Sequence, residues 1–168
     1  MKSKLGVLII LLMALTISCS NSSSTTGGPA EKNVSFVKSS SQFIKNTYKG
    51  ETNPSYLLIR NYSAFDSLFG VAAVMGMDTT KLITAEKMKS GFVVSIIYQG
   101  NDIHEFNIEK ITLKGSQLQV YYTSKVTTPN ASWTCNCHVT ALIENCDFNS
   151  ILLFENGQPV SSAVVKEL

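Results

Sequence analysis

No apolar run in the sequence is long enough to cross a membrane as a helix. The longest run extends from Leu5 to Ile17, which is 13 residues. A helix that spans a bilayer needs about 20 consecutive apolar residues. The sequence therefore predicts no membrane-spanning helix.

The sequence also lacks an excess of charge. Asp, Glu, Lys and Arg together make up 15% of the residues, and the formal net charge is +2. Lys2 and Lys4 precede the apolar run, and the remaining basic residues equal the 12 acidic residues in number. A nucleic-acid partner requires a basic face, so the charge balance argues against nucleic-acid binding.

Catalytic patterns are absent as well. There are two histidines, His104 and His138, and His104-Glu105 lacks the second His of a zinc-protease helix. No Gly-x-Ser-x-Gly elbow and no Gly-rich phosphate loop occurs. A Cys–His pair would require a cysteine to meet His104 in space, and nothing in the sequence argues for that. We predict no enzymatic activity, no cofactor and no metal site.

The N-terminus has the form of an export signal. A positive start at Lys2 and Lys4 precedes the short apolar run, which ends in Leu15-Thr16-Ile17-Ser18-Cys19. This ending resembles the lipobox of bacterial lipoproteins. The resemblance implies that residues 1–18 are removed, that Cys19 carries diacylglycerol and that the new amino group is acylated. The alternative is an ordinary secretory signal in which Cys19 is coincidental.

Residues 19–31 are mostly small and polar, which predicts a flexible tether before one domain at residues 32–168. By resemblance to lipoprotein sorting in Gram-negative bacteria, Ser20 after Cys19 implies the outer membrane. Some lineages send lipoproteins to the cell surface by means of acidic residues soon after the cysteine. No acidic residue occurs between Ser20 and Ala30, which favours the periplasmic side.

Alternation of apolar and polar residues dominates the chain after the tether. The phase of this alternation slips between Ile108 and Ile111, which indicates a bulge. Gly115-Ser116 and Asn156-Gly157 are turn signals. The predicted strands are 34–37, 56–60, 92–99, 103–113, 118–122, 132–143, 150–154 and an edge strand at 159–165.

Two short helices are also predicted. Asn61 is a suitable N-cap for a helix over 63–69, and Thr84 for one over 85–89. The fold class is therefore mainly β (or α+β), an antiparallel sandwich or partly open barrel with one or two short helices.

The second half has a pattern of apolar strands separated by turns. Its segments are Phe92 to Gly100, Phe106 to Ile108, Leu118 to Tyr122, Cys137 to Val139 and Ile151 to Phe154. In this pattern, residues 90–154 resemble the C-terminal domain of the PrcB-like protease-complex subunits. The resemblance implies a non-catalytic accessory subunit or inhibitor of a secreted protease. An exposed edge strand such as 159–165 would receive an extended peptide from the partner.

The sequence departs from this family at two places. Asp102-Ile103-His104-Glu105 replaces a Gly-Gly-Tyr-type turn, and the segment from Trp133 to His138 replaces a Pro-containing approach to a strand. Partner contacts are expected where the family varies. Asp102, His104 and Trp133 are therefore the candidate partner-contact residues.

Three cysteines follow Cys19, and export would place them in an oxidising compartment. Cys135 and Cys137 share one face of a strand at about 6.6 Å, within the reach of a disulfide. The alternative pair, Cys137 and Cys146, requires the strand between them to be broken. We predict a local Cys135–Cys137 disulfide and a buried Cys146 thiol.

Other interpretations remain open. A redox or metal site could be built on Cys135 and Cys137, although His138 would point away from Cys137 on a strand. A glycan-binding or polymer-binding protein would need an exposed aromatic row around Trp133. Asp78-Thr79-Thr80 resembles the O-glycosylation signal of some Gram-negative bacteria.

Overall fold

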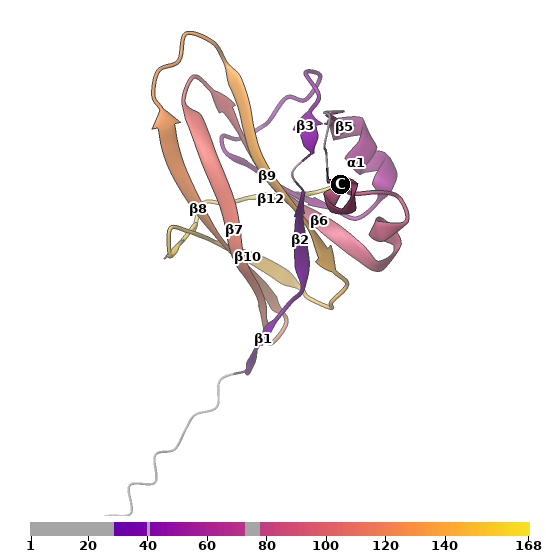
Figure 1. Ribbon diagram of the computed structural model, residues 1–168. Helices are drawn as coiled ribbons and strands as arrows, with labels where there is room; N and C mark the ends of the chain where they lie inside the picture. Colours follow the sequence, from indigo (N-terminus) through magenta and orange to yellow (C-terminus); the bar gives the residue numbers. More distant parts are fainter. Residues whose placement is uncertain (1–28, 40, 73–77) are drawn as a thin grey trace, which may run out of the picture.

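Two five-stranded sheets pack face to face in the computed structural model, which describes residues 29–39, 41–72 and 78–168 (Figure 1). The first sheet contains, in order, β1 (Glu31–Asn33), β7 (Ile103–Lys114), β8 (Gln117–Thr128), β10 (Ser150–Glu155) and β11 (Gln158–Pro159). The second contains β12 (Val165–Glu167), β4 (Ser55–Ile59), β6 (Gly91–Gly100), β9 (Cys135–Glu144) and β2 (Phe36–Ser39). The predicted mainly β class is confirmed.

A smaller layer covers the outer face of the second sheet. It contains the paired strands β3 (Gln42–Ile44) and β5 (Phe69–Val71), helix α1 (Tyr62–Leu68) and the 3-10 helices η1 (Thr79–Lys81) and η2 (Lys87–Ser90). Asn61 caps α1 as predicted, since its side-chain oxygen accepts the Ala64 N–H at 2.8 Å. The second predicted helix is shorter and is of the 3-10 type.

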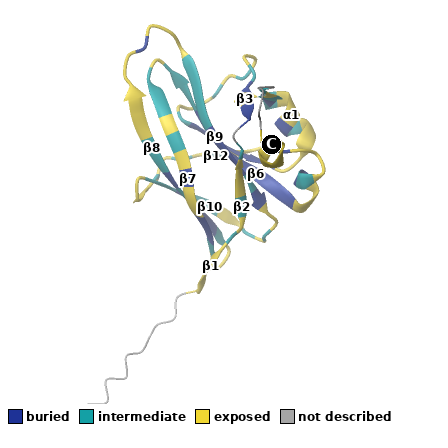
Figure 2. Ribbon diagram, viewed as in Figure 1, coloured by how far each residue is buried: buried dark blue, intermediate teal, exposed yellow. Residues whose placement is uncertain are grey.

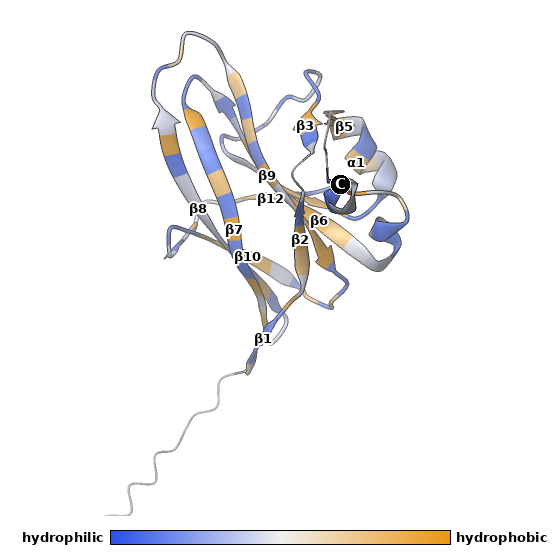
Figure 3. Cartoon of the chain, viewed as in Figure 1, coloured by the Kyte–Doolittle hydropathy of each residue, from blue (hydrophilic) through white to orange (hydrophobic). Residues whose placement is uncertain are grey.

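The apolar alternation produces two cores on the two faces of the second sheet. Tyr56, Val94 and Ile96 face the first sheet and share one core with Val120 and Tyr122 of β8, which face the second sheet. On the opposite face, residues of β4 and β6 pack under the helices and β3. Because both of its faces are covered, β6 is buried over most of its length (Figure 2), and its residues are strongly apolar (Figure 3).

The long β7–β8 hairpin follows the predicted pattern. Its register shifts between Ile108 and Lys110, at the predicted bulge. Gly115 has a φ of +61°, a conformation in which glycine carries no steric penalty. Leu118, Val120 and Tyr122 all point into the core.

Two strand pairs are parallel, although most are antiparallel. β10 pairs in parallel with β8, and β12 pairs in parallel with β4. The predicted edge strand at 159–165 is wrong: only Gln158–Pro159 pairs with β10, and the chain then crosses to the other sheet. Val160, Ala163 and Val165 pack against the core during this crossing, so burial of their side chains directs the segment between the sheets.

The described part of the chain begins at residue 29, within the predicted tether. β1 starts at Glu31, the last tether residue, and pairs with the end of β7 at Lys114. The predicted signal, Cys19 and most of the tether lie outside the described residues. In the part of the chain that is described, no helix has the length and apolar character needed to span a membrane.

Candidate functional site

Most of the candidate residues from the sequence meet at one corner of the sandwich. The β6–β7 and β8–β9 connections both pass between the sheets there (Figure 1). The two connections are joined by hydrogen bonds from the Ala131 N–H to the Asn101 carbonyl at 2.7 Å and from the Asn130 N–H to the Asp102 carboxylate at 2.8 Å. We call the set Tyr98, Asp102, His104, Cys135 and Cys137 the cysteine corner.

Cys135 and Cys137 lie on the same face of β9, with their sulfur atoms 3.2 Å apart. Cys135 Sγ donates to the Asp102 carbonyl at 3.2 Å, and Cys137 Sγ accepts the His104 N–H at 3.2 Å. Burial raises the pKa of the Cys135 thiol to about 11, and the adjacent Cys137 adds to this shift. Both residues are thiols in the structure. The sulfur contact is compatible with the predicted disulfide, which stays a prediction.

Cys146 lies away from this corner. β9 runs unbroken from Cys135 to Glu144, and Cys146 follows its far end. The seven residue steps from Cys137 to Glu144 correspond to about 23 Å along the strand, and the two further residues to Cys146 are too few to bring it back within the reach of a disulfide. The alternative Cys137–Cys146 pair is therefore incompatible with this fold. Cys146 is half-buried against the core, and burial raises its thiol pKa.

The three candidate contact residues have different surroundings. The Asp102 carboxylate is used within the corner, as a cap for the Asn130 N–H. The His104 ring lies 4.0 Å from the Tyr98 ring and 5.4 Å from the Phe106 ring, and its Nδ1 lies 3.2 Å from Ser124 Oγ. Trp133 is 60% exposed. Trp133 alone among the three therefore offers a large exposed surface.

His138 faces the opposite side of β9, as predicted. Its ring centre lies 5.8 Å from that of Phe69, and burial lowers its pKa. It therefore contributes nothing to the cysteine corner. Among the described residues, no group of three or more His, Cys, Asp and Glu side chains is arranged to hold a metal ion.

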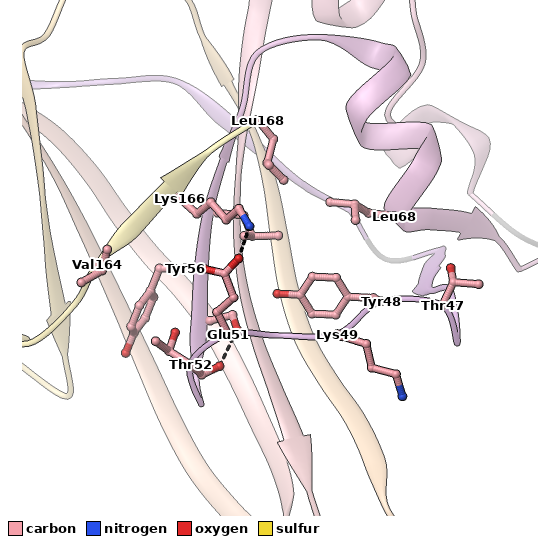
Figure 4. Close-up of a pocket in the computed structure, with 12 residues that line it drawn as sticks. Thr47, Tyr48, Lys49, Glu51, Thr52, Tyr56, Leu68, Val164, Lys166 and Leu168 are labelled. Carbon is pink, nitrogen blue, oxygen red and sulfur yellow. Dashed lines mark hydrogen bonds and ion pairs between the residues drawn. The ribbon is translucent and has the colours of Figure 1, made fainter.

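A second candidate site is a cavity of about 370 Å³ beside β4 and β12 (Figure 4). Its apolar lining consists of Tyr48, Tyr56, Leu57, Leu68, Val164 and Leu168. Its polar lining consists of Thr47, Lys49, Glu51, Thr52, Ser55 and Lys166, of which Glu51 and Lys166 form an ion pair.

Gln99 at the end of β6 holds the segment that forms one wall of this cavity. Its side chain accepts the Gly50 N–H at 2.9 Å and donates to the Tyr48 carbonyl at 3.3 Å. Its backbone makes two more hydrogen bonds with the Asn53 side chain, at 2.8 and 3.0 Å. The wall is thus fixed to the central sheet.

The sequence analysis did not find this cavity. Its walls come from residues 47–57, the end of α1 and the last five residues, which are far apart in the chain. One signal was available: Tyr48 is the only large apolar residue in the polar stretch between Ile44 and Tyr56. An isolated aromatic residue in such a stretch is a candidate for a tertiary contact, because its ring can bury a large apolar area.

Comparison with known proteins adds no relative to this description. No protein-family model matches the chain, no curated protein matches it, and no solved structure matches it. The features available for a functional proposal are therefore the mainly β sandwich, the cysteine corner and the cavity beside β12.

Proposed function

We propose that this protein is a non-catalytic, lipid-anchored protein of the bacterial cell envelope that binds an extended polypeptide segment along the outer edge of β12. The observation that carries the proposal is the position of the cavity beside an edge strand. Strand addition combines main-chain hydrogen bonds at an edge with pockets for alternate side chains. β12 and the cavity supply both elements.

β12 is the last strand of its sheet among the described residues. The Leu168 N–H donates to the Leu58 carbonyl at 2.8 Å, and the Leu168 carbonyl accepts the Arg60 N–H at 3.0 Å. In a parallel pair the residues that bond to the neighbour alternate. The backbone groups of Val165 and Glu167 therefore point outward, where a partner strand can bond to them.

The cavity lies on the face of β12 to which Val164, Lys166 and Leu168 contribute. An added strand also places every second side chain on that face. A volume of about 370 Å³ accommodates one large apolar side chain, and it is at the small end for a separate ligand. The mixed charges of Lys49, Glu51 and Lys166 at the cavity suit a polypeptide rather than a strongly charged partner.

The resemblance of residues 90–154 to the PrcB-like subunits supports one partner class, a secreted or surface protease. In this proposal the chain acts as its accessory subunit or inhibitor. The lipid on Cys19 holds the domain at the membrane, in the outer membrane facing the periplasm. β1 leads to that anchor at the end of β7 opposite the cysteine corner, about 35 Å away along the strand.

A photo-crosslinking residue at position Lys49, beside the cavity, tests the proposal in native membranes. Lys125, exposed on β8, is the control position. We expect Lys49, and not Lys125, to give a crosslink to a protease, with the linked peptide identified by mass spectrometry. Identical products from both positions, or no protein product from Lys49, would contradict the proposal.

A pair of variants tests the strand edge itself. Glu167→Pro removes an outward N–H and leaves the hydrogen bonds of Leu168 to β4 possible. Glu167→Ala removes the same side chain and keeps the N–H. We expect crosslinking from Lys49 to be lost in Glu167→Pro and kept in Glu167→Ala, with both variants folded by circular dichroism. Equal crosslinking in the two variants excludes strand addition at β12.

Glycan binding is the second hypothesis from the sequence, and no observation favours it. In the described part of the chain, the aromatic pairs do not include Trp133. The row of rings formed by Tyr98, His104 and Phe106 is half-buried.

A further inference from the structure

The two thiols of the cysteine corner are close enough to react with each other. Their sulfur atoms are 3.2 Å apart, and a disulfide bond measures about 2.0 Å. The two residues occupy alternate positions on β9, so their Cα atoms already have a permitted separation of about 6.6 Å. Closing the remaining gap also requires β9 to bend locally, because the Cβ atoms of a disulfide lie about 3.5–4.5 Å apart and those of alternate strand residues lie farther apart.

Hydrogen bonds distinguish the two sulfurs. Cys135 Sγ is a donor to the Asp102 carbonyl, whereas Cys137 Sγ is an acceptor from the His104 N–H. A hydrogen bond that a sulfur accepts stabilises negative charge on it, and the thiolate is the nucleophile in thiol chemistry. Cys137 is therefore the better placed of the two to attack.

We propose that Cys135 and Cys137 form a reversible dithiol–disulfide pair that reacts by exchange with a small-molecule or protein disulfide, with Cys137 as the attacking sulfur. The raised pKa of Cys135 agrees with this assignment, because a protonated thiol is a poor nucleophile. The proposal is independent of the binding site at β12.

The exchange proceeds in two steps. Cys137 loses its proton to solvent and attacks one sulfur of the incoming disulfide, so a mixed disulfide forms and the first thiolate leaves. Cys135 then loses its proton, attacks Cys137 Sγ and releases the second thiolate. Two electrons pass from the cysteine pair to the incoming disulfide, which becomes two thiols.

Oxidation changes the contacts of the corner. A disulfide sulfur has no proton, so the Cys135 donor to the Asp102 carbonyl is lost. The bonds from Asn130 to Asp102 and from Ala131 to Asn101 do not involve sulfur and remain. The β6–β7 connection therefore loosens locally, while the two sheets stay paired.

Thiol alkylation of the purified full chain in oxidised and reduced glutathione buffers tests the pair. We expect Cys135 and Cys137 to become resistant to alkylation together, with a Cys135–Cys137 bond in the peptide map and full recovery after dithiothreitol. Cys146→Ser is the matched control and should behave like the unchanged protein. Stable glutathione adducts on both residues, independent alkylation of the two, or a bond to Cys146 would each overturn the pair.

Two single variants test the assigned order. Cys135→Ser should accumulate a glutathione adduct on Cys137, because the resolving sulfur is missing. Cys137→Ser should form its adduct on Cys135 at least about tenfold more slowly, since only the thiolate attacks. Equal rates, or a faster reaction of Cys137→Ser, would overturn Cys137 as the attacking sulfur. Circular dichroism and chemical denaturation report whether each variant keeps the fold.

Discussion

The hydroxyl oxygen of Tyr56 lies 3.1 Å from that of Tyr122 in the core between the two sheets. Tyr56 belongs to β4 and Tyr122 to β8, so this hydrogen bond links opposite sheets. Tyr122 is 1% exposed, and burial raises the pKa of both phenols. The two hydroxyls therefore stay protonated in the folded protein at neutral pH, with each able to satisfy the other.

Loss of this bond should destabilise the domain. We expect Tyr122→Phe to lower the free energy of unfolding by about 1 kcal/mol, because it leaves the Tyr56 hydroxyl without its partner. Chemical denaturation measures the effect. Tyr121→Phe is the control, since the Tyr121 side chain is only half-buried and its hydroxyl donates to Gln119, two residues away, and it should change stability less. An equal decrease in the free energy of unfolding in both variants would show that the Tyr56–Tyr122 hydrogen bond stabilises the domain no more than the Tyr121–Gln119 bond does.

The same pair predicts a loss of stability at alkaline pH. The pKa of each phenol is higher in the folded chain than in the unfolded chain, so the unfolded state releases its protons first. The stabilisation is complete below about pH 10 and is lost as the pH rises above that value. Unfolding titrations between pH 8 and 11 should show a smaller decline for Tyr122→Phe. An unchanged decline would assign the alkaline sensitivity to other groups.

His138 predicts a dependence at acid pH. Burial lowers its pKa, so the unfolded chain binds a proton more readily than the folded chain. Its contribution to stability is complete above about pH 6.5 and decreases as the pH falls from there towards the lowered pKa of the folded protein. We expect His138→Gln to flatten the stability profile between pH 7 and 5. Phe69→Leu loosens the same packing but keeps the imidazole, so it should be less stable throughout and retain the slope.

Two glycines should respond to alanine for different reasons. Gly157 has a φ of +80° and open space around its missing Cβ, so Gly157→Ala adds only conformational strain, about 1 kcal/mol. A Cβ on Gly91 would lie 2.4 Å from the Ile143 carbonyl oxygen, so Gly91→Ala must displace β9 from β6. We expect a larger loss for Gly91→Ala, roughly 2–3 kcal/mol in denaturant unfolding. A Gly157→Ala loss equal to or greater than that of Gly91→Ala would contradict this distinction.

The proposed lipid attachment at Cys19 can be tested by replacing this cysteine. Cys19→Ser should remove incorporation of labelled fatty acid and release the protein from membranes, because the attached acyl chains supply the membrane affinity. Radiolabelling with palmitate and fractionation measure both effects. Cys146→Ser is the matched control and should keep label and membrane location. No labelling of the unchanged protein would favour an ordinary secretory signal, and continued labelling of Cys19→Ser would mean that the lipid is attached to another residue.

The positions of strands, turns and the first helix could be predicted from the sequence where local signals are strong. The slip between Ile108 and Ile111 became the bulge, and Asn156-Gly157 became the turn after β10. The Asn61 cap of α1 needed only local chemistry, because a side-chain oxygen can reach a free N–H within the first turn.

The prediction of the edge strand at 159–165 was wrong, because the local sequence of this segment does not determine which sheet it joins. Residues 159–165 read as a strand, yet their apolar side chains are buried by a crossing between sheets. That placement depends on which surface is available after the sheets have formed. The glycosylation-like segment Asp78-Thr79-Thr80, whose modification stays a prediction, forms an exposed 3-10 turn in which the Asp78 side chain accepts the Thr80 N–H.

Periodicity and turn chemistry by themselves determined the mainly β class and most strand positions, and the N-terminal pattern predicts an anchor at Cys19, which stays a prediction. Each of these depends on interactions within a few residues of the chain. The tertiary structure alone decided that Cys137 meets His104, that Tyr48 and Leu168 share a cavity, and that β12 joins β4 in parallel. Such contacts join residues 33 to more than 100 positions apart, and they arise because two cores must be buried on the two faces of one sheet.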